Sequence, residues 1–269
     1  GSRVSVVGDV HGCAQELRAL LAACRFAPER GDAVVLVGDL VNKGPSSAEV
    51  VRAAVDGGFH AVLGNHDVIG LDRWRSWKLT GSVPAADQHG SYEYVRELRA
   101  ADVEWLEGLP MTLTLADQGE ALVVHAGLVP GVPLEQQAEE DMYSLRNLMA
   151  SEEPAGGREQ ASGPGAVAYE PTPGYGVDVG QPWAQVWDGL VDGRGPRFLL
   201  FGHDAPRGLQ QCEHAWGLDT NCCNGGSLTA CILPGRELVS VPALGSLHKT
   251  GEGEAREWRP LAAAGAAGA

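Results

Sequence analysis

The segment VVLVGDLVNKGP, residues 34–45, decides the fold because an apolar run leads directly into a polar turn. The run Ala33–Val37 is short and rich in valine, which predicts a strand buried on both faces. Gly38 allows the backbone to turn sharply after this strand. The polar side chains that follow are therefore expected at the carboxyl end of a buried strand.

Four other segments repeat this order of an apolar run followed by a short polar motif. They read RVSVVGDVHG at residues 3–12, FHAVLGNHD at 59–67, ALVVHAG at 121–127 and RFLLFGHDA at 197–205. Open α/β sheets bind ligands beyond the carboxyl ends of their strands. We therefore expect the five motifs to converge on one site.

The polar residues of the motifs form a ligand set that suits two divalent metal ions. Carboxylate, amide and imidazole donors favour Mn, Fe, Zn or Co over a site built from thiolates. One ion is predicted to bind Asp9, His11 and Asp39. The second ion is predicted to bind Asp39, Asn65, His125 and His203. Because a carboxylate has two oxygens, Asp39 can bridge the ions, which would clamp a phosphoryl group and lower the pKa of a bridging water.

Other residues of the motifs are candidates for catalysis and substrate binding. His66 is the best candidate to protonate the leaving oxygen or to stabilise its charge. Lys43 and Arg146 are predicted to neutralise phosphate oxygens, and arginine can do so through two hydrogen bonds. Asn42 and Asn65 are the further predicted substrate contacts. Each residue alone has a structural explanation, such as a turn or a surface ion pair, so the prediction depends on the five motifs together.

The rest of the chain predicts a mixed α/β domain with two sheets. Helices are expected at residues 14–24, 46–55 and 134–149, and further strands at 111–115, 215–218, 228–233 and 238–241. One domain is predicted over residues 3–245, with a flexible tail at 246–269. The Gly- and Pro-rich stretch 151–182 is interpreted as a mobile loop or as a loop close to the substrate.

Charge and composition limit the kinds of molecule that the protein is expected to bind. Twenty Lys and Arg against 35 Asp and Glu give a net charge of −15, which disfavours general nucleic-acid binding. The sequence has no apolar run of membrane-spanning length and no visible signal peptide, so an intracellular, cytoplasmic location is expected. The protein is also expected to be a monomer.

Gly1-Ser2 resembles a cloning remnant, so the native N-terminus can be missing. The six cysteines include no CxxC pair, which favours reduced thiols over a structural zinc site.

The five motifs together resemble those of the calcineurin-like metallophosphoesterases, within the phosphoprotein phosphatase superfamily. This resemblance covers about residues 3–241 and implies an αββα sandwich of two mixed β-sheets. It also implies the two-metal ligand set given above, with manganese as the first choice.

The variant GDLVNKGP at residues 38–45 resembles the ApaH-like phosphatases, relatives of bacterial symmetrical diadenosine tetraphosphatase. Further strings agree, namely HAGLVPGVPLEQQ at 125–137, SLRN at 144–147 and GLDTNCCNGGSLTA at 217–230. This branch is implied to cleave phosphoanhydrides. The candidate substrates are dinucleoside polyphosphates such as diadenosine tetraphosphate, inorganic polyphosphate, nucleoside triphosphates and the 5′ cap of mRNA.

The alternative activity is that of a protein phosphatase acting on phosphoserine, phosphothreonine or phosphotyrosine. Those enzymes resemble GDxVDRG and GNHE, whereas this chain has Asn42, Lys43 and Asp67 at the differing positions. The missing aspartate removes the usual partner that orients the proton-donating histidine. A phosphoanhydride releases a phosphate of low pKa, which needs less help from a general acid.

A non-enzymatic module and a nuclease or phosphodiesterase are the remaining hypotheses. The first is expected to lack metal ligands, all of which are present, and the net charge disfavours a general nuclease. The basic and aromatic residues at 73–78 either stack on a nucleobase or belong to an amphipathic helix whose tryptophans lie in the core.

Overall fold

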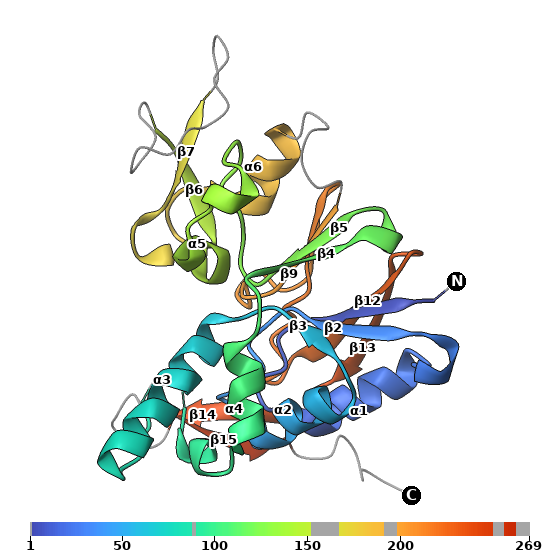
Figure 1. The fold of residues 1–269 in the computed structure, drawn as a ribbon. Helices are drawn as coiled ribbons and strands as arrows, with labels where there is room; N and C mark the ends of the chain where they lie inside the picture. The colour runs from blue at the N-terminus through green and yellow to red at the C-terminus, as the bar shows by residue number, and fades with distance from the viewer. Residues whose placement is uncertain (1, 88–89, 152–166, 191–197, 250–255, 262–269) are drawn as a thin grey trace, which may run out of the picture.

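The computed structural model describes residues 2–87, 90–151, 167–190, 198–249 and 256–261. Its centre consists of two five-stranded sheets packed face to face, with helices on the outer faces (Figure 1). Both sheets are mixed, so the predicted αββα sandwich is confirmed.

The first sheet has the order β13-β12-β1-β2-β3. Its strands are β1 (Val4–Val7), β2 (Ala33–Leu36), β3 (His60–Ala61), β12 (Ser227–Leu233) and β13 (Glu237–Pro242). The strands β1, β2 and β3 are parallel, and β12 joins antiparallel to β1. Consequently, the motifs after β1, β2 and β3 leave the sheet at the same edge.

The second sheet has the order β10-β11-β9-β5-β4. Its strands are β4 (Thr112–Leu115), β5 (Ala121–Val124), β9 (Phe198–Phe201), β10 (Gln210–Gln211) and β11 (Ala215–Gly217). Because β5 and β9 are parallel neighbours, the motifs after them also lie side by side.

Apolar side chains fill three layers. Between the sheets, valines of β1 and β2 pack against Val123 and Leu200 of the second sheet. Three helices cover the outer face of the first sheet: α1 (Ala14–Ala23), α2 (Ser47–Asp56) and α4 (Ala100–Glu107). The second sheet is covered by α6 (Trp183–Leu190), and α5 (Glu139–Ser144) lies close to it. Most buried strand residues are thus aliphatic, as the apolar runs predict.

The helix α3 (Asn65–Thr80) begins at the third motif. The basic and aromatic residues at 73–78 lie in this helix, but its apolar side chains do not gather on one face. Trp74 is half-buried and packs against the core, whereas Trp77 is half-buried outside it, with Lys78 Nζ 4.4 Å from its ring centre. All six cysteines are free thiols, as expected. Within the residues that the structure describes, helices lack the combination of length and apolar character needed to cross a membrane.

The prediction of a helix at residues 134–149 is wrong for the second half of this range. A single 3-10 turn (Leu134–Gln136) and α5 are followed by the strand β6 (Asn147–Ser151). This strand pairs with β7 (Ala168–Pro171) and β8 (Gln181–Pro182) in a small third sheet. Helix propensity determines secondary structure only weakly, and here the pairing of residues 147–151 with two distant segments overrides it. Part of the predicted loop 151–182 is therefore strand, and its residues 152–166 lie outside the described residues.

The predicted flexible tail contains a strand pair. β14 (Gly245–Lys249) and β15 (Arg256–Pro260) are antiparallel, and Leu247 lies opposite Trp258. The Leu247 N–H donates to the carbonyl of Cys223, which ties the pair to the body of the domain. The Ala- and Gly-rich composition of the end of the chain concealed the contribution of Leu247 and Trp258. Residues 262–269 lie outside the described residues.

Replacing Trp183 by alanine should destabilise the protein by about 3–5 kcal/mol, because a buried aromatic side chain would leave a cavity. The Trp183 side chain is fully buried, and its ring lies 4.8 Å from that of Phe201. The measurement is the free energy of unfolding in urea. Leu190→Ala in the same helix, where the side chain is 44% exposed, is the control and should change it by less than about 0.5 kcal/mol. Equal effects of the two changes would contradict the packing described.

Candidate metal centre

Backbone hydrogen bonds hold the five motifs against one another. The N–H groups of His11 and Gly12 donate to the carbonyls of Asp39 and Leu40, which joins the first motif to the second. The Gly202 N–H donates to the carbonyl of His125, which joins the fourth to the fifth. The two sheets are connected where the His203 N–H lies 3.1 Å from both carboxylate oxygens of Asp9. The motifs therefore form one continuous site across both sheets.

Asp39 lies at the centre of this site. Its Oδ2 is 3.3 Å from His11 Nε2, and its Oδ1 is 3.4 Å from His125 Nε2. Potential ligand atoms of His11, Asp39 and His66 all lie within 4.8 Å of one another, and so do those of Asp39, His125 and His203. Because Asp39 belongs to both groups, its position suits a carboxylate that bridges two ions.

Three imidazoles of the site are oriented by main-chain carbonyls. The pairs are His11 Nδ1 with Val41 O at 3.1 Å, His125 Nδ1 with Val37 O at 2.8 Å, and His203 Nε2 with Ser144 O at 3.1 Å. A carbonyl oxygen can only accept, so each ring donates its hydrogen there and its other nitrogen keeps a lone pair. This arrangement fixes a metal-binding tautomer in all three rings.

The lone pairs of Asn65, His125 and His203 point toward one another, and no hydrogen lies between these atoms. Asn65 Oδ1 lies 3.2 Å from His125 Nε2 and 3.0 Å from His203 Nδ1. The two nitrogens are the ones left without a hydrogen, and the amide oxygen is also an acceptor. Acceptors this close repel one another unless a cation lies among them. The residues therefore fit a divalent ion, although their role as ligands remains a prediction.

The pKa values agree with a site that is ready to bind cations. Burial raises the pKa of Asp39, but positive charge on the neighbouring imidazoles, His125 first, and on Lys43 outweighs it and holds this pKa below its usual range; when the rings are neutral, Lys43 supplies that charge. Burial, followed by the charge of Lys43, lowers the pKa of His11 to about 3. Burial also lowers the pKa of His203, with His125 as the next cause. The carboxylate is thus ionised and these rings are neutral, which are the forms that coordinate metal.

Asp9 differs, since burial and then the charges of Asp219 and Asp39 raise its pKa. This carboxyl group lies in a region of excess negative charge, which is what bound cations would offset. Its side chain is also held closely by the fold, because a Cβ atom at Gly202 would overlap Asp9 Oδ1. In the same way, a Cβ atom at Gly64 would overlap Asp39 Oδ1.

The predicted phosphate-binding cations lie at the site. Lys43 Nζ is 2.8 Å from His11 Nε2, and Arg146 Nη2 donates to the carbonyl of His203 at 3.1 Å. His66 is the second residue of α3, and its backbone N–H donates to Asp39 Oδ1 at 2.8 Å. The ring of His66 lies edge to face with that of His11, with centres 4.8 Å apart. The structure therefore brings together every residue in the predicted set.

Asn42 has a role that the sequence interpretation did not foresee. It was expected to contact substrate, and its replacement of aspartate was expected to leave His66 without its usual partner. The side chain is fully buried, and its Nδ2 lies 3.1 Å from His66 Nδ1. Its Oδ1 accepts from the Lys43 N–H at 2.9 Å. Both ends of the amide are thus engaged by the protein, and one of them contacts His66.

Two buried carboxylates were missed as site residues. Asp67 accepts from the N–H groups of Leu40, Val41 and Gly64, so it holds the second and third motifs together. Burial and the charge of Asp39 raise its pKa to about 8. Asp219 lies beside Asp9, and burial raises its pKa. The available signal was the position of these residues within the GNHD and GLDTN strings.

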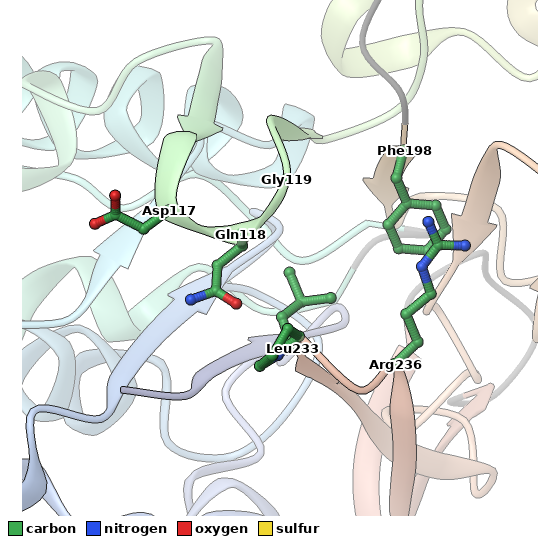
Figure 2. Close-up of a pocket in the computed structure, with 7 residues that line it drawn as sticks. Asp117, Gln118, Gly119, Phe198, Leu233 and Arg236 are labelled. Carbon is green, nitrogen blue, oxygen red and sulfur yellow. The ribbon is translucent and has the colours of Figure 1, made fainter. Parts of the chain in front are cut away.

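A hollow at the far edge of the sheets is separate from this site. It is lined by Gln118, Phe198, Leu233 and Arg236, among others, and the Arg236 guanidinium lies over the Phe198 ring (Figure 2). Phe198 begins β9, and Leu233 pairs with Val4 at the start of β1. The predicted metal ligands follow the opposite ends of these strands.

Comparisons with known proteins agree with this geometry. A family model described as calcineurin-like phosphoesterase matches residues 2–207. The symmetrical bis(5′-nucleosyl)-tetraphosphatase of Methylobacillus flagellatus is 30% identical over 271 residues, covering 88% of this chain and 94% of the relative. The enzyme of the same name from Paracidovorax citrulli is 31% identical over 278 residues, covering 87% and 95%. The crystal structure of a candidate diadenosine tetraphosphatase has a TM-score of 0.71 at 35% identity and covers 90% of this chain and 94% of that one.

The fold and the converging ligand set define a metallophosphoesterase, a class of hydrolase. The family match over most of the chain shows that this protein belongs to the calcineurin-like phosphoesterases. The relatives confirm its resemblance to the ApaH-like branch.

Asp39→Asn should lower the metal content and reduce activity by several orders of magnitude, because an amide has one coordinating oxygen and no negative charge. Metal content can be measured by mass spectrometry after gel filtration, in parallel with phosphatase activity. Asp56→Asn, at an exposed position at the end of α2, should change neither. Full metal content together with full activity in Asp39→Asn would refute the bridging role.

Asp67→Asn should weaken metal binding about 10- to 100-fold, because an amide cannot accept from all three backbone N–H groups that orient the second and third motifs. The measurement is a titration in competition with a coloured chelator. Asp72→Asn, an exposed position in the same helix, is the matched control and should bind as the unmodified protein does. An unchanged affinity in Asp67→Asn would show that these hydrogen bonds do not support the site.

Proposed function

We propose that this protein hydrolyses the phosphoanhydride bonds of dinucleoside polyphosphates, with diadenosine tetraphosphate as the first substrate to test. The observation that carries the proposal is the convergence of lone pairs around Asp39, with Lys43 and Arg146 at its margin. The names of the two tetraphosphatase relatives support the choice of substrate. Polyphosphate, nucleoside triphosphates and capped RNA are further members of the same substrate class.

The proposed ligand sets are Asp9, His11 and Asp39 for one ion and Asp39, Asn65, His125 and His203 for the other, with manganese as the first choice. When bound, the ions would hold phosphoryl oxygens and lower the pKa of a water molecule. Lys43 places an ammonium group beside His11, where it can neutralise a phosphate oxygen. Arg146 adds a second cation beside His203.

Other groups of the chain orient the imidazoles and stabilise charge. The carbonyls of Val37, Val41 and Ser144 keep the three imidazoles in one tautomer, so no proton has to move before substrate binds. His66 is proposed to stabilise the charge of the leaving oxygen. A polyphosphate carries many negative charges, so local cations must offset the overall net charge of −15. The monomeric state and the cytoplasmic location remain proposals from the sequence.

Protein loaded with Mn²⁺ should convert diadenosine tetraphosphate symmetrically to ADP and leave a phosphoserine peptide essentially unchanged. The products can be quantified by chromatography, with protein treated with a chelator as the control. The physical reason is the low pKa of the departing phosphate, which makes little demand on a general acid. Rapid dephosphorylation of the peptide with an intact dinucleotide would instead identify a divergent protein phosphatase.

A further inference from the structure

Arg146 reaches the site from a part of the chain that the two central sheets do not place. It lies between α5 and β6, in the segment that leaves the second sheet after β5 and returns at β9 (Figure 1). The five motifs, by contrast, each follow a strand of the two central sheets. The position of this guanidinium therefore depends on the contacts that its neighbours in the chain make with the motifs.

The residues on either side of Arg146 contact the segment that follows β9. The carbonyl of Ser144 lies 3.1 Å from His203 Nε2, and Arg146 Nη2 donates to the carbonyl of His203 at 3.1 Å. Asn147, the next residue, accepts from Arg207 Nη2 at 2.6 Å through its Oδ1. Arg146 thus lies between two points at which its segment is attached to the fifth motif.

The guanidinium of Arg207 connects the fifth motif to β6. Its Nη1 donates to Asp204 Oδ2 at 2.6 Å, and its Nη2 donates to Asn147 Oδ1 at the same distance. The Nη2 group also lies 3.4 Å from the carbonyl of Val177, between β7 and β8. Because a guanidinium is planar and presents its N–H groups in a fixed fork, it holds these partners in one arrangement relative to one another.

The groups in this link are largely shielded from water. Asn147 is 1% exposed and Asp204 is 3% exposed, while the side chain of Arg207 is 21% exposed. Gln210 Nε2 donates to the same carboxylate oxygen at 3.0 Å, and Asn147 Nδ2 donates to the carbonyl of Val179 at 2.6 Å. Hydrogen bonds to charged groups are stronger where little water competes for them. The link is therefore expected to be stiffer than an ion pair on the surface.

We propose that Arg207 is a positioning residue, which holds Arg146 at the candidate metal centre by fixing Asn147 to Asp204. The proposal rests on the phosphohydrolase function given above and deepens it. Arg207 acts through Arg146 and does not itself contact the phosphate. A guanidinium whose backbone is already held in place loses less conformational freedom when a phosphate binds, so the link raises the affinity for phosphate.

Lysine at position 207 would keep the charge but not the link. An ammonium group is a point charge on a single nitrogen, so it can pair with Asp204 but cannot reproduce the fork that also reaches Asn147. Arg207→Lys is therefore expected to retain the fold and to release β6 from the fifth motif. Asn147→Ala breaks the same link from the other side and leaves the pair of Arg207 and Asp204 intact.

The affinity for inorganic phosphate tests the proposal. In protein loaded with Mn²⁺, calorimetry should show phosphate binding weakened about 5- to 10-fold by Arg207→Lys and by Asn147→Ala. The affinity for Mn²⁺ should change by less than about twofold in both variants, because the predicted ligands remain. An equal loss of affinity for Mn²⁺ and phosphate would overturn the proposal, since the link would then support His203 instead.

A double-mutant cycle shows whether Arg207 acts through Arg146. Arg146→Met alone should weaken phosphate binding about 10-fold. In this background, Arg207→Lys should weaken it by less than a further factor of about two, because the contact that Arg207 positions is already absent. Losses that multiply would overturn the proposal, and so would an unchanged affinity in Arg207→Lys. Asn147→Ala in the same background gives the decision if Arg207→Lys does not fold.

Arg99→Lys is the matched control. Arg99 also forms a fork on a buried carboxylate three residues away, with its Nη2 2.6 Å from Asp102 Oδ1, but it lies at the start of α4. This change should leave phosphate binding as it is in the unmodified protein. Because none of these titrations uses a dinucleotide, failure of the link can be told from failure of the proposed function, which the reaction with diadenosine tetraphosphate tests separately.

Discussion

The structure depends on holding several hydrogen-bond acceptors together with no hydrogen between them. Asp39, Asn65, His125 and His203 direct lone pairs at a common space, and they come from both sheets. Acceptors held this close repel one another, so this cluster is unfavourable unless a cation lies among them. The aliphatic layer between the sheets fixes the strands and thereby keeps the cluster assembled. The free energy of folding thus maintains a repulsion between acceptors that a bound cation would relieve.

The main chain does much of the orienting in this centre. The carbonyls that accept from His11 and His125 belong to Val41 and Val37, on either side of Asp39. One short segment therefore supplies a carboxylate and also sets the tautomers of two rings. Side-chain substitutions at Val37 or Val41 would leave these carbonyls in place. Asn42 is the exception, because there a side chain, through its Nδ2, lies 3.1 Å from Nδ1 of His66.

The parts of the fold that could be read from the sequence are those encoded in contiguous residues. A buried strand followed by a glycine and a polar residue is a local pattern, so the convergence of Asp9, Asp39 and His203 was predictable. The strand β6 was not, because its partners are 17 or more residues away and its own residues favour a helix. Asp67 was missed for a different reason, since its carboxylate binds backbone N–H groups, and no pattern of side chains reveals that.

The parallel pair β5 and β9 has an evolutionary consequence. The chain leaves the second sheet after the first of these strands, builds α5, the small third sheet and α6, and returns at the second. This excursion reaches the ligand cluster through the Ser144 carbonyl and Arg146. It can therefore be lengthened or remodelled while both of its ends remain anchored, so a lineage could acquire new substrates here and inherit its catalytic centre unchanged.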